Sequence, residues 1–263
     1  MMAEQNQVYP SVKQAICLIF LYVMSTVLVI IVTNILFNED AIHDSLPMLC
    51  RSLFAAGVTL GFAYLMKRKR GEKFISGFRK TDVKICFWMI LIPPLFLFFM
   101  LCLMFFIFAF WGSPDTLPLY KSTDIYTFIN IVCVTPLFEE LLFRGIMLDG
   151  FLRRYSFLKA MALSVFFFAI LHFSFQILTA TFLGILAGYV YFITKSIWPC
   201  IMLHVANNLS AYLVMCLDSN SGILTDLYTG NMICYVGVCW LLDISLLSFI
   251  LYRFFALHKI KYK

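Results

Sequence analysis

Few side chains inside the long apolar runs of this sequence can ionise, and all but one of them belong to three short polar islands. Ionisable residues are costly within a bilayer, so they mark candidate functional sites. The group comprises Glu139, Glu140, Arg144, His172, His204 and, standing alone, Asp243. We interpret the isolated Asp243 as a buried residue of helix packing or of a cavity, without a catalytic role.

The first island is Glu139-Glu140-Leu-Leu-Phe-Arg144. Adjacent residues of a helix point about 100° apart, so the two glutamates cannot share one role. Glu140 and Arg144 are four residues apart on one face, in the favourable order for an ion pair. Glu139 has no local cation and suits a base that activates water. The alternative is a structural cluster that pins helices together.

The other two islands supply imidazole and amide groups. In Phe168-x-x-x-His172 the two side chains share a helix face, and the alternative to catalysis is a histidine that only makes hydrogen bonds in the core. In His204-Val-Ala-Asn207-Asn208 the first and last residues share a face. An imidazole and an amide at that spacing could stabilise a negatively charged oxygen. They could equally form hydrogen bonds between membrane helices.

Taken together, the islands form the ordered triple EExxxR, FxxxH and HxxxN on consecutive apolar segments. This triple resembles the CPBP family, which comprises CAAX prenyl endopeptidases, bacterial Abi relatives and bacteriocin self-immunity proteins. The resemblance covers about residues 125–215, the motif core. The remaining segments match only as generic apolar spans.

The resemblance implies an intramembrane endopeptidase that hydrolyses a peptide bond of a membrane-associated peptide or protein. It assigns the activation of water to Glu139 and His172, and the stabilisation of the oxyanion to His204 and Asn208. Glu140 and Arg144 would support these four residues. We expect no cofactor, since no HExxH motif fixes two metal ligands on one helix. The alternative is zinc held by Glu139, His172 and His204.

The elements that must position these residues are membrane helices. The 263 residues are 62% hydrophobic and 13% charged, whereas a soluble domain has about 25% charged residues. This composition excludes a soluble domain, a disordered chain and a disulfide-rich secreted module. A membrane helix needs about 20 apolar residues. The sequence predicts one all-α, polytopic domain over residues 1–263, with eight segments at about 14–37, 46–66, 85–110, 125–148, 158–175, 177–194, 196–217 and 232–256.

Counting residues along these segments exposes one conflict. At 1.5 Å per residue, Glu139 lies about 9 Å and His204 about 12 Å from the inner membrane face. His172 lies about 21 Å from that face on the same count, too far to meet them. Either the fifth helix begins outside the membrane, or Pro136 bends the fourth.

The basic residues predict an orientation. Eight of them fall between Lys67 and Lys84, in a loop between apolar runs, which indicates a cytoplasmic membrane loop and argues against nucleic-acid binding. With eight helices both termini are then cytoplasmic. The richness in Phe, Ile, Lys and Tyr favours a bacterial cell membrane.

Two other functions compete with the protease. One is a non-catalytic membrane protein of the bacteriocin-immunity type, which binds without cleaving. The other is a proton-coupled transporter that uses Glu139 and the histidines as a relay, although such transporters often show two related halves. We expect the partners to be a peptide or protein substrate and membrane lipid, with no nucleic acid.

Overall fold

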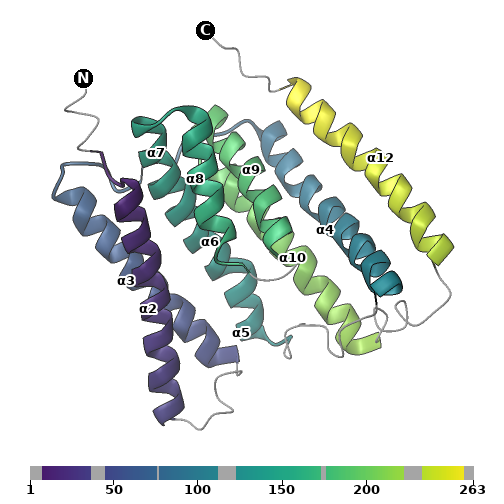
Figure 1. The fold of residues 1–263 in the computed structure, drawn as a ribbon, viewed down its shortest axis with the longest axis horizontal. Coiled ribbons are helices and arrows are strands. Elements are labelled where there is room, and N and C mark those ends of the chain that lie inside the picture. Colours follow the sequence, from purple (N-terminus) through teal and green to yellow (C-terminus); the bar gives the residue numbers. More distant parts are fainter. Residues whose placement is uncertain are drawn as a thin grey trace.

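The structure is a computed structural model, and it describes residues 8–36, 45–75, 77–111, 123–172, 176–221 and 233–257. Within these ranges all regular structure is helical (Figure 1). Six helices are long and apolar enough to cross a membrane. They are α2 (Val12–Leu36), α3 (Ser45–Arg68), α4 (Val83–Trp111), α9 (Gln176–Thr194), α10 (Trp198–Ser221) and α12 (Ile233–Leu257). The predicted all-α polytopic fold is therefore confirmed.

The fourth predicted span is a single helical run with two π-helical stretches. It comprises α5 (Ile125–Phe128), η2 (Ile129–Val134), α6 (Thr135–Glu140), η3 (Leu141–Leu148) and α7 (Asp149–Arg154), where η denotes π-helix. Asp124 caps its start by accepting a hydrogen bond from the Thr127 amide. The prediction ended this span at 148, whereas the run continues to Arg154. The fifth span is the shorter α8 (Phe157–Ala169).

This later end removes the conflict over the depth of His172. Tyr155 and Ser156 form the turn between α7 and α8. Glu139 lies 16 residues before Tyr155, and His172 lies 16 residues after Ser156. In an antiparallel pair of helices with nearly equal rise, these two positions fall at similar depth. The fifth helix starts at Phe157, within one residue of the prediction, so it is the longer fourth run that brings the two positions to one level.

The centre of the molecule is η3. Leu142, Phe143, Ile146, Met147 and Leu148 are all fully buried there. Figure 1 shows this part of the chain between the α2–α3 pair on one side and α9, α10 and α4 on the other, with α12 packed outside α4. The central run therefore carries the first polar island into the best-protected part of the bundle.

Small residues let α9 approach its neighbour α8 closely. A Cβ atom added at Gly188 would come within 2.7 Å of the Met161 side chain, and one at Gly184 would meet Val165 at 3.5 Å. Membrane helices commonly pack through small residues four apart, because lipid offers no hydrophobic driving force between them. This contact fixes α8, and with it the second island, against the bundle.

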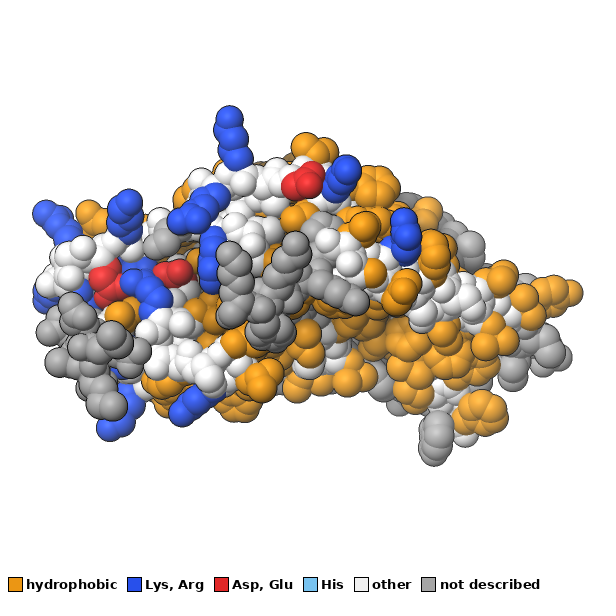
Figure 2. Space-filling view, turned by 90° about the horizontal axis from the view of Figure 1, so that it is seen from above, with side chains coloured by type: hydrophobic (Ala, Val, Ile, Leu, Met, Phe, Trp, Pro, Cys, Tyr) orange, Lys and Arg blue, Asp and Glu red, His pale blue; other side chains and the backbone are white. Residues whose placement is uncertain are grey.

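One end of the bundle is basic. The segments that carry Lys67, Arg153, Arg154 and Lys195 all reach the top of Figure 1, and Figure 2 shows lysine and arginine side chains gathered on that face. This grouping agrees with the predicted inner loops. Most of the acidic residues of the opposite loops, such as Asp115, lie outside the described residues.

The same end binds the first described residues of the chain. Arg154 donates a hydrogen bond to the Val8 carbonyl, and the Tyr9 amide donates to Glu72 at 2.8 Å. Gly150 permits this contact, because an added Cβ would lie 2.6 Å from the Tyr9 carbonyl oxygen. Gly150 thus has a structural role at this end.

Candidate active site

A buried carboxylate joins the first and third islands. Glu140 Oε1 lies 2.7 Å from Arg144 Nη1 and 2.9 Å from His204 Nδ1. The side chains of Glu140 and Arg144 are each 1% exposed, so this is an ion pair deep in the bundle. The predicted Glu140–Arg144 pair is present. The bond from the same oxygen to His204 was not predicted.

This bond settles the geometry of His204. A carboxylate paired with arginine can only accept, so Nδ1–H of His204 is the donor. The other ring nitrogen, Nε2, therefore points elsewhere, and it lies 3.7 Å from Glu139 Oε2. That separation is too long for a hydrogen bond but short enough for a strong electrostatic interaction.

Glu139 differs from Glu140 as the residue pattern predicted. It is 8% exposed, and its Oε2 atom has no hydrogen-bond partner among the described residues. Glu140 Oε2 has none either, but Glu140 is held through Oε1 by Arg144 and His204. Buried polar atoms in proteins nearly always have a partner. An acceptor left open in the bundle, facing an imidazole, is suited to bind a water molecule.

His172 lies in the turn that follows α8. Its Nδ1 atom is 3.0 Å from the carbonyl oxygen of Phe168, one of the last carbonyls of the helix. A carbonyl can only accept, so Nδ1 carries the proton and Nε2 of the neutral ring is an acceptor. The ring is close enough to Glu139 to interact with it electrostatically.

Phe168, the first residue of the second island, makes more contacts in the site than its helical spacing from His172 predicted. Its ring covers the Arg144 guanidinium at 4.4 Å and meets the His204 ring edge-on at 5.8 Å. It also packs at 4.9 Å from the His172 ring. Phe168 is 1% exposed, so it packs among these polar groups inside the bundle and fixes their spacing.

Asn208 is positioned by a backbone carbonyl of the central helical run that lacks a backbone donor. In η2 the Thr135 amide donates to the Asn130 carbonyl, five residues back. The next bond of this π-helical pattern would run from residue 136 to the Ile131 carbonyl, but Pro136 has no N–H. Asn208 takes its place: the Nδ2 atom donates to the Ile131 oxygen at 2.9 Å.

This bond also orients Asn207. The Ile131 carbonyl accepts, so the amide nitrogen of Asn208 must face it and Oδ1 must face away. Asn207 Nδ2 then donates to Asn208 Oδ1 at 3.0 Å. One N–H of Asn208 is left for another acceptor. Asn207 was not among the predicted site residues. The only signal in the sequence was its position next to Asn208 in the third island.

The structure thus brings Glu139, Glu140, Arg144, His172 and His204 together, with Asn208 one turn from His204. Asp243 lies apart from them on α12, and its Oδ2 atom has no hydrogen-bond partner among the described residues. It is 6% exposed, as expected for a residue of helix packing.

The alternative zinc site can be tested against this geometry. Across the described ranges, no three His, Cys, Asp or Glu side chains are arranged so that they could bind one metal ion. His204 Nδ1 bonds to Glu140 and His172 Nδ1 to a backbone carbonyl, so Nε2 of each ring is the atom that could bind a metal. As placed in the structure, Glu139, His172 and His204 do not form a metal site, and the expectation of a metal-free site stays a prediction.

Comparison with known proteins supports the predicted family. Residues 121–210 match the family model described as type II CAAX prenyl endopeptidase, Rce1-like. The matched segment contains all three islands. No curated protein and no solved structure matches the chain.

Proposed function

We propose that this protein is an intramembrane endopeptidase whose base is Glu139. Its substrate would be a membrane-associated peptide or protein. The observation that carries the proposal is that the two adjacent glutamates make different contacts. Both glutamates have an Oε2 atom without a hydrogen-bond partner among the described residues. Glu140 is paired through Oε1 with Arg144 and His204, whereas Glu139 has no such pairing and lies 3.7 Å from His204 Nε2.

In the proposed reaction, a water molecule binds between Glu139 and His172. One hydrogen atom of this water faces Glu139 Oε2, and the other faces His172 Nε2. Glu139 removes a proton as the water oxygen attacks the carbonyl carbon of the scissile bond. Glu139 then returns this proton to the leaving amine as the C–N bond breaks.

The negative charge that develops on the substrate oxygen needs donors. Asn208 has one N–H that is not used by the Ile131 carbonyl. His204 can donate from Nε2 only as an imidazolium, with Nδ1–H directed at Glu140. Donors oriented in advance by Glu140 and Ile131 cost little reorganisation during the reaction.

The decisive experiment replaces Glu139 by glutamine in the full chain. This variant retains the shape of the side chain but cannot accept a proton, so cleavage should be abolished while protein yield and thermal stability stay near those of the parent. The matched control is Asp243→Asn, which neutralises a buried carboxylate outside the site and should cleave normally. The probes are fluorogenic peptides carrying either a prenyl group or an apolar membrane segment.

The outcome distinguishes the competing functions. If Glu139→Gln still cleaves, Glu139 is structural and the mechanism is wrong. If the parent cleaves neither type of probe yet shields cells from a bacteriocin, the result supports the non-catalytic immunity function. Inhibition by a chelator with recovery on added zinc would replace the metal-free mechanism with a metal-dependent one.

We further propose a setting for this activity. The basic end of the bundle would face the cytoplasm of a bacterial cell, with both termini on that side. In that membrane an exported peptide, or its leader, is a more plausible substrate than a prenylated protein. The two types of probe in the cleavage assay separate these substrate classes.

A further inference from the structure

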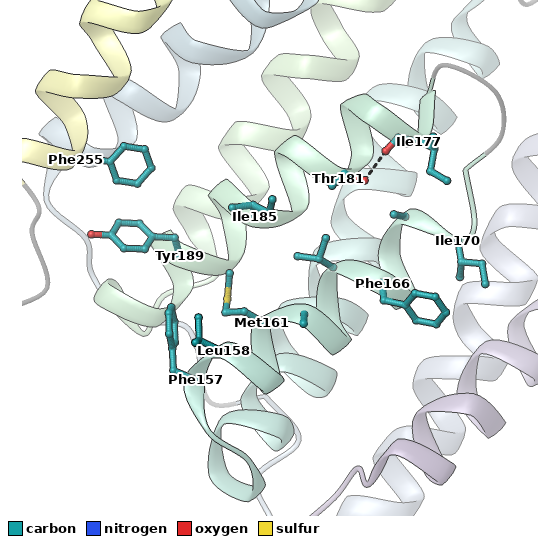
Figure 3. Close-up of a pocket in the computed structure, with 13 residues that line it drawn as sticks. Phe157, Leu158, Met161, Phe166, Ile170, Ile177, Thr181, Ile185, Tyr189 and Phe255 are labelled. Atoms are coloured by element: carbon teal, nitrogen blue, oxygen red, sulfur yellow. Dashed lines mark hydrogen bonds between the residues drawn. The ribbon is translucent and has the colours of Figure 1, made fainter.

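An apolar groove runs along the outside of the bundle between α8 and α9. Its volume is about 680 Å³, within the range of about 300–1,000 Å³ usual for small-molecule sites. Figure 3 shows Phe157, Tyr189 and Phe255 around one end of it, and Ile170 and Ile177 at the other. The hydroxyl of Thr181, in its wall, donates to the Ile177 carbonyl at 2.7 Å. The middle of the groove therefore offers contacts only to hydrocarbon.

The groove is long enough to extend through the hydrocarbon of one leaflet of a bilayer. From Phe157 to Ile170 the α8 wall covers 13 residues, or about 20 Å at 1.5 Å per residue. Half of a roughly 30 Å hydrocarbon core is about 15 Å. An occupant that enters at the basic end would reach the middle of the membrane, as a lipid acyl chain does.

Two lysines stand at the basic end of this groove. Lys159 lies seven residues before Phe166, about two turns along the same face of α8, and its Nζ is 4.9 Å from the Tyr155 ring. Lys195 Nζ is 4.6 Å from the Phe192 ring, which in turn packs at 4.4 Å on Phe157. Both lysine side chains are exposed.

The charges around Lys195 are mainly positive. Asp149 is the acidic group whose field reaches Lys195, and it is paired with Arg153 at 2.7 Å. Arg79 adds a further positive charge at the same place. The rim of the groove is thus complementary to an anion at the membrane surface.

We propose that the groove binds a phospholipid with an anionic headgroup, its phosphate at Lys159 and Lys195 and one acyl chain along the α8–α9 wall. The lipid comes from the leaflet at the basic end. A lipid in the groove contacts both α8 and α9 and so stabilises the packing of their outer faces. The site is separate from the proposed hydrolysis, and its test measures no cleavage.

The experiment measures the thermal unfolding midpoint of the purified full chain in detergent. Phosphatidylglycerol should raise the midpoint, whereas phosphatidylcholine and glycerol phosphate without acyl chains should not. The double variant Lys159→Gln/Lys195→Gln should lose this specific rise, because the headgroup loses its partners. Ala162→Trp should lose it also, because the indole fills the groove.

Cys239→Trp is the control for added bulk, since Cys239 is exposed on α12 outside the groove; it should respond as the parent does. Thr181→Trp fills the groove from α9 and replaces Ala162→Trp if that variant does not fold. An equal rise with phosphatidylcholine, a rise with glycerol phosphate alone, or a full response of the lysine variant would overturn the proposal. So would a dimer of the parent that Ala162→Trp dissociates, because the occupant would then be a second copy.

Discussion

At the scale of single residues, the candidate site depends on one oxygen atom with two partners. Glu140 Oε1 contacts both Arg144 and His204, and all three side chains are buried. A buried carboxylate without its cation is strongly destabilising, since its charge is then neither hydrated nor paired. Arg144 is therefore as important to the architecture as the groups proposed to react.

Arg144→Ala should lower both stability and cleavage. It leaves Glu140 buried without its cation, and removing one partner of such a pair costs about 3–5 kcal/mol. It also removes the group that Phe168 covers at 4.4 Å. Chemical denaturation of parent and variant measures the loss, with Arg153→Ala, at an exposed pair, as the control. A variant as stable and active as the parent would show that the buried pair does not form.

Asn207→Ala tests whether the orientation of Asn208 matters. Without the donor from Asn207, the amide of Asn208 is held only by the Ile131 carbonyl. We expect slower cleavage, but a smaller loss than for Asn208→Ala, where removal of an oxyanion donor costs about a hundredfold or more. The rate constants of the two variants and the parent are compared on one fluorogenic peptide. An Asn207→Ala rate equal to the parent's would leave Asn207 without a positioning role.

At the scale of elements, the central helical run owes its function to irregular geometry. The π-helical stretches η2 and η3 flank the two glutamates, and π-helical turns are frequent at functional sites. Pro136 interrupts the backbone bonding and leaves the Ile131 carbonyl to a side chain of another helix. The backbone of one helix thereby fixes a side chain of α10.

Pro136→Ala restores the missing backbone donor and should reduce the dependence of the fold on Asn208. In the parent, Asn208→Ala leaves the Ile131 carbonyl without its donor, which costs about 1–3 kcal/mol when such a group is buried. In the Pro136→Ala background the new N–H can satisfy this carbonyl, so the cost of Asn208→Ala should fall. A double-mutant cycle on thermal stability measures the difference. Equal costs in both backgrounds would contradict the proposed exchange of donors.

At the scale of the whole molecule, the bundle has one basic end, and its membrane orientation follows from that asymmetry. Reporters fused after Lys80 or Lys263 should be cytoplasmic, and reporters inserted near Asp115 or Asn220 should be external. Enzymatic and fluorescent reporters that are active on opposite sides of the membrane provide the measurement. A C-terminal reporter on the external side would overturn the arrangement of eight membrane segments.

The sequence by itself determined the membrane class, the helical fold and the identity of the polar groups. These follow from local properties: apolar runs long enough for a bilayer, and helical spacing within each island. It also predicted that Glu140, and not Glu139, pairs with Arg144, because one helix turn sets both positions.

Only the tertiary structure decided how the islands meet. The end of the central run at Arg154 sets the depth of His172, and hydrophobic patterning cannot fix a helix end to within a turn. The contacts of His204 with Glu140 and of Asn208 with Ile131 join residues 64 and 77 positions apart. Such contacts depend on how helices pack, and on which donors the backbone leaves unused, so no local pattern encodes them.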